Sequence, residues 1–501
     1  MSDSRIRTIV IVGAGATGWM VAAVLARVLK RTHCEIRLID VPAAEATVRS
    51  EAANPAFHRL RTLLSLDERD LMRRTEATFN LGTEFRDWGR PGERYFHTFG
   101  TFGARLEAVP FHNYWLRLRQ AGNVGSIEDF SCATGLAKRA RFAPPVSDQR
   151  SVLSLYSYGY HFPSLRLGAY LKEYAQARGV LCVAREVAEV KRRDSDGFVE
   201  ALRLNDGTVV EGDLYLDCTA SGTLAKGSLE VGFEDWSHWL PCDRAITVSC
   251  AAVQDAPPSS QSLATSGGWQ WRIPMRRELD CGQAYSSRFS SEEAATAALL
   301  GALPSPPLGE PRSLRFAAGR PKQFWTRNCV WICSGAMEPL ESLRLHLVQT
   351  AVTRLLTTFP DREFNPSDAE EYNRLTIAEH ERIRDFLILH YWTTARHDSP
   401  FWEYCRSMDV PDTLRHKVEL FRRSGRVSLS DDEHFGEESW LSVLLGHGVM
   451  PESYDPLADV MSAAEVGSAL SRMRSMIHTA IETVPTQREF MAKHYGIGNE
   501  A

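Results

Sequence analysis

The 501-residue chain carries no surplus of positive charge. It has 58 Lys and Arg residues against 63 Asp and Glu residues, a formal net charge of −5. This balance gives no electrostatic reason to expect nucleic acid or an acidic membrane as a partner. It also lacks a run of about 20 uncharged apolar residues, the length that a membrane-spanning helix requires. The short apolar start runs directly into a glycine-rich turn and carries no cleavage site, so we predict no export signal and a cytoplasmic protein.

Paired cysteines and the spacings of metal or hydrolase sites are missing as well. The 10 Cys are scattered without a C-x-x-C pair, and the nearest approach is Cys329 and Cys333. Scattered thiols in a long chain without an export signal fit a reducing compartment, where most are buried packing residues. No H-x-x-x-H spacing with a third ligand and no G-x-S-x-G elbow occur, so neither a metal site nor that hydrolase class is predicted.

The chain does have enough length for two or more lobes. A β-rich apolar strand (8–13), a helix (17–30) and a second strand (35–40) predict a βαβ unit at the N-terminus. Farther along, the patterns predict a strand meander that returns to a buried strand at 214–217. From residue 340 onward most patterns are helical. The coarse prediction is a mixed α/β core with a helical C-terminal lobe.

The βαβ unit contains the segment GAGATG, which places Gly13, Gly15 and Gly18 in the G-x-G-x-x-G spacing, with Thr17 inside it. Because this loop follows a strand and opens a helix, its glycines allow a tight turn, a close approach to pyrophosphate and helix–strand packing. Asp40 ends the second strand, where a carboxylate can accept hydrogen bonds from a ribose diol. A glycine-rich turn without ligand is the alternative, and NAD(P) and FAD are not distinguished by these residues.

A second motif is GGWQWRIPM, with Trp269, Trp271, Ile273 and Pro274 in the pattern W-x-W-x-I-P. Alternating Trp residues on a strand share one face, and a core or interface plug is the plain interpretation. Together with GxGxxGW, however, the motif resembles the signature of flavin-dependent tryptophan halogenases. Similar stretches run along most of the chain, among them YFHTFGTFG (95–103), YGYHFPSLRLGAYL (158–171), SGAMEPLES (334–342) and SWLSVLLGHGVMPESYDPLAD (439–459).

The resemblance implies an FAD-binding, GR2-like, Rossmann-type mixed sheet core over residues 1–340, discontinuous, with substrate-side segments inserted around 95–170. A mainly helical substrate-side lobe over 341–501 is appended to it. Such enzymes receive reduced FAD from a separate flavin reductase and react it with oxygen to a flavin hydroperoxide, which halide attacks to give hypohalous acid. This oxidant passes through a tunnel to a Lys, and a Glu beside the aromatic substrate aids substitution. The W-x-W-x-I-P residues line the tunnel side. The oligomeric state is left open, with a homodimer as one arrangement.

At the position of the family's Lys, in a stretch like A-T-F-K-L-G, this chain has Asn80. An amine can act as a nucleophile or ammonium donor, whereas a carboxamide nitrogen does neither well. Asn80 is therefore a candidate catalytic-position residue, and a polar turn or helix-end residue is the equally good alternative.

The segment GAMEPLESLRLHL places Glu338 and Glu341 three residues apart. By resemblance Glu341 is the catalytic carboxylate and Ser342 links the flavin and substrate sites; the acidic start of a helix is the alternative. Leu343 and Arg344 replace the family's Thr-Gly halide cradle, and glycine's open backbone is lost there. In RSEAANP, Glu51 and Ala52 match the family's flavin-binding strap, with Ser50 and Ala53 as departures.

His97, Phe99 and Trp440 lie in stretches that hold indole in relatives, and aromatic faces suit an aromatic substrate. A hydrogen-bonded structural histidine is the plainer interpretation of His97. We therefore expect an FAD-dependent monooxygenase-type oxidoreductase acting on an aromatic, indole-like substrate, with halogenation, and halide as cosubstrate, in question. Two alternatives stay open: a working halogenase of an indole or tryptophan-like substrate, and a catalytically degenerate flavin- or ligand-binding protein.

Overall fold

The structure is a computed structural model that describes residues 4–30, 34–40, 49–107, 109–122, 124–220, 222–224, 227, 229–332, 338, 340–431 and 433–496. Its contacts divide the chain into two units. Unit 1 comprises residues 1–77, 162–237 and 314–381, and unit 2 comprises 78–161, 238–313 and 382–501. Both units are thus discontinuous, and residues 341–381, predicted as part of the C-terminal lobe, belong to unit 1.

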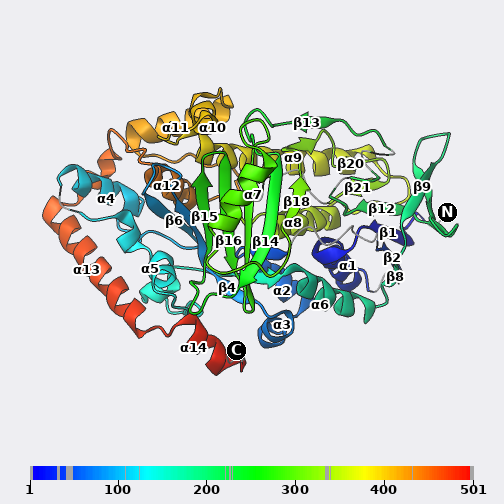
Figure 1. The fold of residues 1–501 in the computed structure, drawn as a ribbon, viewed down its shortest axis with the longest axis horizontal. Coiled ribbons are helices and arrows are strands. Elements are labelled where there is room, and N and C mark those ends of the chain that lie inside the picture. Colours follow the sequence, from blue (N-terminus) through cyan, green and yellow to red (C-terminus); the bar gives the residue numbers. More distant parts are fainter. Residues whose placement is uncertain are drawn as a thin grey trace. The chain divides into compact units, whose positions relative to one another are not determined.

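Unit 1 is built on a six-stranded sheet of order β20-β21-β12-β1-β2-β8 (Figure 1). Its strands are β1 (Thr8–Val12), β2 (Glu35–Ile39), β8 (Leu181–Val183), β12 (Leu214–Asp217), β20 (Trp325–Thr326) and β21 (Cys329–Trp331). All neighbours pair in parallel except the antiparallel edge pair of β20 with β21. Helix α1 (Gly15–Val28) follows β1 and leads to β2, so the predicted βαβ unit is confirmed, with its helix starting two residues earlier. The predicted buried strand over 214–217 is β12.

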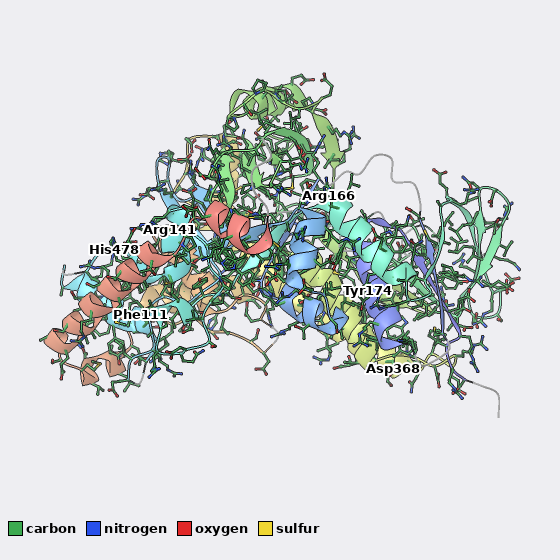
Figure 2. The ribbon with its side chains drawn as sticks, turned by 90° about the horizontal axis from the view of Figure 1, so that it is seen from below. Phe111, Arg141, Arg166, Tyr174, Asp368 and His478 are labelled. Carbon is green, nitrogen blue, oxygen red and sulfur yellow. The ribbon has the colours of Figure 1, made fainter. Side chains whose placement is uncertain are left out.

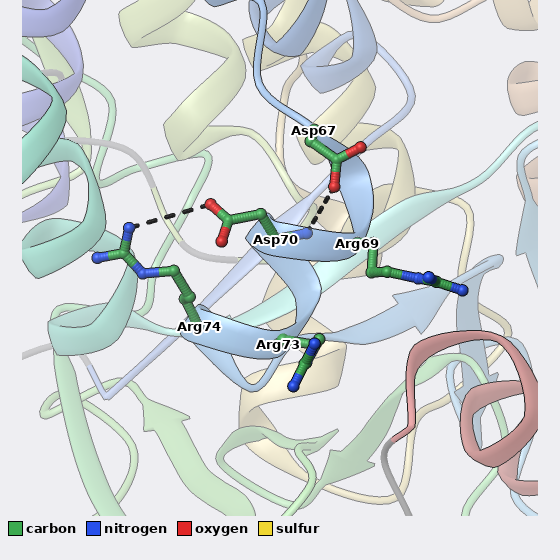
Figure 3. A pocket seen from close by; sticks show the side chains of 5 residues that line it. All are labelled: Asp67, Arg69, Asp70, Arg73 and Arg74. Atoms are coloured by element: carbon green, nitrogen blue, oxygen red, sulfur yellow. Dashed lines mark hydrogen bonds and ion pairs between the residues drawn. The ribbon is translucent and has the colours of Figure 1, made fainter.

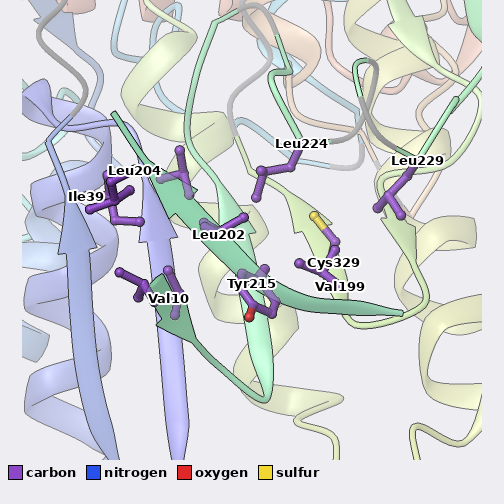
Figure 4. Packing of buried hydrophobic residues seen from close by; sticks show 11 residues of the cluster. Val10, Ile39, Val199, Leu202, Leu204, Tyr215, Leu224, Leu229 and Cys329 are labelled. Atoms are coloured by element: carbon purple, nitrogen blue, oxygen red, sulfur yellow. The ribbon is translucent and has the colours of Figure 1, made fainter. Parts of the chain in front are cut away.

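The core of unit 1 fills one face of this sheet. Figure 4 shows Val10, Tyr215 and Cys329 of the sheet packed with Leu202 of β10. The meander of β9 (Val187–Arg192), β10 (Val199–Leu204) and β11 (Val209–Glu211) covers that face. Buried parallel strands need an apolar cover of this kind because both of their faces are removed from water.

The helices of unit 1 pack on one another: α1 contacts α2 (Phe57–Leu64), α6 (Ser164–Gln176) and α8 (Arg344–Thr357), and α3 (Glu68–Thr75) contacts α6. Figure 2 labels Arg166 and Tyr174 on α6. Asp67 caps α3 by accepting a hydrogen bond from the Asp70 backbone N–H at 2.8 Å, as Figure 3 shows. Strand β3 (Ser50–Ala53) lies against α8, and β13 (Phe233–Asp235) pairs with β19 (Gly319–Pro321).

Unit 2 is built on a seven-stranded sheet of order β18-β14-β17-β16-β15-β5-β6. Its strands are β5 (Gly82–Arg86), β6 (Arg94–Thr98), β14 (Arg244–Ala251), β15 (Ser260–Thr265), β16 (Gly268–Pro274), β17 (Glu278–Tyr285) and β18 (Arg312–Arg315). Helix α7 (Glu292–Gly301) lies over β14 and β17 in Figure 1 and buries Leu299 against Val248 and Cys281. A separate short strand, β4 (Thr78–Asn80), pairs with β7 (Gly159–Pro163).

Helices make up much of the rest of unit 2, and all but α12 begin at a side-chain cap or a proline. They are α4 (Phe111–Gln120), α5 (Cys132–Lys138), α10 (Pro400–Ser407), α11 (Asp412–Ser424), α12 (Glu437–Gly446), α13 (Ala463–Thr483) and α14 (Gln487–Tyr495), with short 3-10 turns η1 (Ile127–Phe130), η2 (Val152–Ser154) and η3 (Pro456–Val460). Ser462 and Thr486 form capping boxes at the starts of α13 and α14. Figure 2 labels Phe111 on α4 and His478 on α13, two helices that contact each other. Helix α9 (Pro366–Trp392) contributes residues to both units.

The predicted fold class, a mixed α/β core with a helical C-terminal part, is confirmed. No helix in the described part of the chain has the length and hydropathy of a membrane span.

Candidate functional site

The glycine loop of unit 1 has the geometry that a dinucleotide requires. Gly13 has φ +98°, and a Cβ there would lie 3.0 Å from the Cys218 carbonyl carbon, at the end of β12. A Cβ on Gly18 would lie 1.9 Å from the Gly13 carbonyl oxygen, so only glycine lets the helix approach the strand. Gly15 has φ +79° and open space where its Cβ would be. This open backbone at the N-terminus of α1 fits the pyrophosphate of FAD.

The neighbouring polar residues keep the predicted places. Thr17 is buried in the first turn of α1. Asp40 directly follows β2, and its backbone N–H donates to the Val183 carbonyl at 2.9 Å. Partial burial raises the pKa of the Asp40 carboxyl above its usual value, and the Lys172 ammonium opposes that rise. Asp40 is thus half-buried at the end of the strand, as a ribose ligand must be; its role stays a prediction.

Glu51, the predicted strap residue on β3, is held by protein groups. Its carboxylate is 3% exposed and forms an ion pair with the guanidinium of Arg344, whose Nε donates to Oε2 at 3.0 Å and whose Nη2 contacts Oε1. Ser164 Oγ donates to Glu51 Oε1 at 3.2 Å. Burial lowers the pKa of Arg344 to about 10, so the guanidinium is still charged at neutral pH. Ala52 beside it is half-buried.

Arg344 is also the first residue of α8, and the two acidic residues before it are not in the helix. Leu343 is the N-cap residue, its side chain makes no capping hydrogen bond, and the first turn of α8 contains no acidic residue. Glu338 is buried, whereas Glu341 and Ser342 are half-buried in the irregular segment that precedes the helix. The alternative of an acidic helix start is therefore wrong, and the catalytic assignment of Glu341 and Ser342 stays a prediction.

Asn80, at the family Lys position, is fully buried at the end of β4 in unit 2. Its Oδ1 accepts a hydrogen bond from the Gly82 backbone N–H at 2.9 Å, which is the geometry of an Asx turn. Gly82 has φ +136°, and a Cβ there would lie 2.2 Å from the His97 carbonyl oxygen. Asn80 thus shapes the tight entry into β5, as the turn-residue alternative expects.

The W-x-W-x-I-P segment is strand β16, in the middle of the unit 2 sheet. Trp269 is fully buried, with its ring centroid 6.2 Å from that of Trp88. Trp271 is half-buried and its indole N–H donates to Asp280 Oδ2 at 3.4 Å. On the same strand, Ile273 is half-buried and the Pro274 carbonyl accepts from Thr78 Oγ1 at 2.8 Å. The tunnel-side role of these four residues stays a prediction.

Replacing Gly282 with Ala is expected to lower the free energy of unfolding by about 2 kcal/mol. Gly282 pairs with Trp271 across β16 and β17, and a Cβ there would lie 1.9 Å from Trp271 Cζ2. The indole must move and lose its hydrogen bond to Asp280. Urea unfolding measures the loss. Gly301→Ala is the matched control, because no atom lies within 4 Å of a Cβ at that position on α7. Equal stability of the two variants would contradict the crowding.

His161 links β7 to this strand region. It is fully buried, its Nε2 lies 3.0 Å from Ser260 Oγ and its Nδ1 lies 3.5 Å from Thr78 Oγ1. Burial lowers the pKa of His161 to about 3. The imidazole is therefore neutral in the folded protein at any pH near neutrality.

This burial predicts acid sensitivity. His161 is protonated below its ordinary pKa of about 6.5 in the unfolded chain, but only below about pH 3 in the folded protein. Protonation therefore stabilises the unfolded chain, and the free energy of unfolding falls as the pH drops below 6.5. Because of this single group, the free energy of unfolding is expected to be about 2 kcal/mol lower at about pH 5 than at pH 7. His161→Gln, which keeps a hydrogen-bonding side chain, should remove that share of the pH slope in urea unfolding at the two pH values. An unchanged slope would mean that His161 charges in the folded protein.

The predicted substrate-side residues lead to a buried aromatic cluster in unit 2. His97 Nε2 lies 2.9 Å from Ser439 Oγ, at the start of α12. The ring centroid of Phe386 lies 5.6 Å from that of His97 and 5.2 Å from that of Trp440, and Phe435 stacks on Phe386 at 3.8 Å. We call His97, Phe386, Phe435 and Trp440 the aromatic nest. The structure therefore brings His97 and Trp440 together through Phe386.

Phe99 does not share these contacts. It is half-buried, and its backbone N–H donates to the Leu81 carbonyl at 2.9 Å. Among the described residues its ring makes no contact with the nest, so its substrate-side role remains a prediction. The hydrogen bond to Ser439 agrees with the structural interpretation of His97.

Four residues of this region were missed by the sequence analysis: Phe386, Phe435, Lys417 and Glu433. Lys417 Nζ lies 2.7 Å from Glu433 Oε2 and 4.1 Å from the ring centroid of Trp440. A signal for Lys417 exists, because it falls on the apolar stripe of α11 formed by Leu414, Val418 and Phe421, which are buried. Phe386, Phe435 and Glu433 carry no such local signal.

Asp217, in unit 1, was also missed; its carboxylate accepts from the Leu224 and Thr219 backbone N–H groups and orders the turn after β12, beside Gly13.

Comparison with known proteins agrees with this arrangement. The family model described as tryptophan halogenase matches residues 8–463. The chain belongs to the tryptophan halogenase family. Tryptophan 6-halogenase ThaL of Streptomyces albogriseolus is 29% identical over 99% of both chains. Among solved structures, the flavin-dependent halogenase BrvH of Brevundimonas sp. BAL3 is 38% identical with a TM-score of 0.94, covering 98% of this chain and 99% of that one. The flavin-dependent halogenase Xcc4156 of Xanthomonas campestris is 35% identical with a TM-score of 0.94, covering 98% of both chains.

Family membership confirms the resemblance: the chain belongs to a family of enzymes that are flavin-dependent halogenases. The same likenesses support the alternative of a working halogenase better than the expectation of an oxygenase with halogenation in question. Two features of this chain depart from the family pattern: the buried Asn80 at the position of the Lys, and the Arg344–Glu51 ion pair at the position of the Thr-Gly pair.

Proposed function

We propose that the protein is a flavin-dependent halogenase that acts on an electron-rich, indole-like aromatic ring. The observation that carries the proposal is the likeness, over 98% of this chain, to the flavin-dependent halogenases BrvH and Xcc4156. The named relative ThaL is a tryptophan 6-halogenase, which supports an indole as the first substrate to test.

The residues of unit 1 fit FAD. The open backbone of Gly15 and the first turn of α1 would hold the pyrophosphate, and Asp40 would accept from the ribose. Reduced FAD, delivered by a separate flavin reductase, supplies with oxygen the oxidising power for halide. The chain's own contribution is then to hold this cofactor and to exclude water around the reacting ring.

The nest fits an aromatic substrate. Its four rings are buried and pack on one another, so an indole beside them would meet aromatic surfaces. Ser439 holds His97 in one orientation. By resemblance to the family, Glu341, on unit 1, is the catalytic carboxylate of the proposal. The Asn80 carboxamide is a poor nucleophile, so in this proposal halogenation proceeds without a nucleophilic side chain at position 80.

A second candidate is oxygenation of the same aromatic substrate, which Asn80 and the Arg344–Glu51 ion pair favour. An Asx-turn amide replaces the family amine, and a guanidinium and its carboxylate partner stand at the family's halide cradle. Both features weaken the case for halide as the group that is oxidised.

One experiment separates the candidates. The purified protein is first titrated with FAD and followed by flavin absorbance. It is then supplied with a flavin reductase, oxygen, bromide and a panel of indoles and phenols, and product masses are read. A bromine isotope pattern supports halogenation, whereas addition of oxygen alone overturns it in favour of the second candidate. Failure to bind FAD overturns both and leaves a ligand-binding relative.

A further inference from the structure

A nearly buried ion pair lies beneath Trp440. Lys417 of α11 and Glu433, between α11 and α12, approach to 2.7 Å with side chains 14% and 3% exposed. Removing two charges from water is costly, and an apolar pair of similar volume often gives equal or better stability. Stability alone is therefore a poor explanation for this pair.

The cation is aimed at a ring. Lys417 Nζ lies 4.1 Å from the centroid of Trp440, whose side chain is fully buried, so the ammonium is held between a carboxylate and an indole face. Ser430 Oγ donates to Glu433 Oε2 at 3.3 Å and fixes the carboxylate in turn. A desolvated cation–π contact is among the stronger contacts that an indole makes. Lys417 thus fixes where the Trp440 ring lies.

Two further polar atoms at this ring lack partners. Trp440 Nε1 and Glu433 Oε1 are both buried and have no hydrogen-bond partner among the described residues. An unpaired buried donor or acceptor keeps its desolvation cost without compensation. The ion pair and the two unsatisfied atoms thus lie around one side chain, and buried polar groups without partners call for an explanation other than packing.

The cation also changes the ring electronically. An ammonium over one face draws π density toward itself, and the ring becomes a poorer electron donor to its other neighbours. The nest ring that contacts Trp440 is Phe386, at an interplanar angle of 79°, and Phe435, the most exposed ring of the nest at 6%, stacks on Phe386. An electron-poor Trp440 favours an electron-rich ring beside it.

We propose that Lys417, held by Glu433, is a specificity-determining residue that acts through Trp440. It positions the indole of Trp440 and biases the nest toward electron-rich aromatic ligands. The inference rests on the proposed function, because it takes the nest as the place where the aromatic substrate binds.

The test measures binding, without flavin, halide or turnover. The affinities of methoxyindole, indole and nitroindole, substituted at the same ring carbon, are determined by calorimetry for the full-length protein. The wild type is expected to bind methoxyindole about tenfold more tightly than nitroindole. Lys417→Met should bring that ratio close to one, and Lys417→Arg, which keeps a cation, should retain it.

Matched variants and outcomes keep the inference falsifiable. Near-UV circular dichroism checks the fold of each variant, and Lys417→Gln, which still donates to Glu433 without charge, replaces Lys417→Met if that variant does not fold. Glu433→Gln keeps the ammonium and should keep the ratio. A ratio unchanged in the neutral variants, or an equal loss for all three ligands, overturns the inference while the proposed function stands. Failure of the wild type to bind any of the three overturns both.

Discussion

Arg344→Met is expected to lower the free energy of unfolding by about 3–5 kcal/mol. The substitution removes the guanidinium that pairs with the Glu51 carboxylate, which is 3% exposed and keeps the hydrogen bond from the Ser164 hydroxyl. A buried charge that loses its partner is far more costly than the pair is beneficial, because its desolvation remains. Urea unfolding monitored by far-UV circular dichroism measures the change.

The double variant makes this explanation testable. Glu51→Gln combined with Arg344→Met removes both charges, so most of the lost stability should return. The single variant Arg344→Lys keeps a cation without the two-pronged contact and should fall between wild type and Arg344→Met. If Arg344→Met stays within about 1 kcal/mol of wild type, the Glu51 carboxylate is not desolvated as its 3% exposure implies.

Local patterns predicted the elements that depend on near neighbours in the chain. The βαβ unit, the strand over 214–217 and the position of Asp40 after β2 follow from apolar runs and glycine spacing, which act over a few residues. The Asx turn at Asn80 belongs to the same class, because Asn and Gly two residues apart suffice to indicate it.

Contacts between distant segments could not be predicted in this way. The Arg344–Glu51 pair joins residues 293 positions apart. The sequence shows that Arg344 stands where the family has glycine, but it does not show that Arg344 pairs with Glu51. The nest depends on how α9, β6 and the segment before α12 pack, and no period of 2.0 or 3.6 residues encodes that. The two-unit division likewise arises from long-range contacts, and it cuts α9 rather than falling in a linker.

Asn80→Lys is expected to raise bromination of indole by about 100-fold when Leu343→Thr and Arg344→Gly are present as well, and far less when it is alone. A lysine amine can act as a nucleophile or ammonium donor, which the Asn80 carboxamide cannot do. Thr and Gly restore the small polar pair at the start of α8, and Thr is a better N-cap residue than Leu343. Product formation is measured by mass spectrometry with reductase, oxygen and bromide in excess.

The decisive comparison is with Asn80→Met in the same background. Met has the length of Lys without the amine, and both substitutions remove the Asx turn to Gly82, so the cost of losing the turn is common to the two variants. Lys alone also places an amine at this fully buried position. Because Arg344→Gly also frees Glu51, each protein is first compared by near-UV circular dichroism and FAD titration. If Lys and Met variants brominate equally, no amine at position 80 takes part, and the turn at Asn80 is what this chain requires there. If only the Lys variant gains activity, the absence of an amine at position 80 is what limits halogenation by this chain. The cofactor site and the aromatic site then already support the reaction.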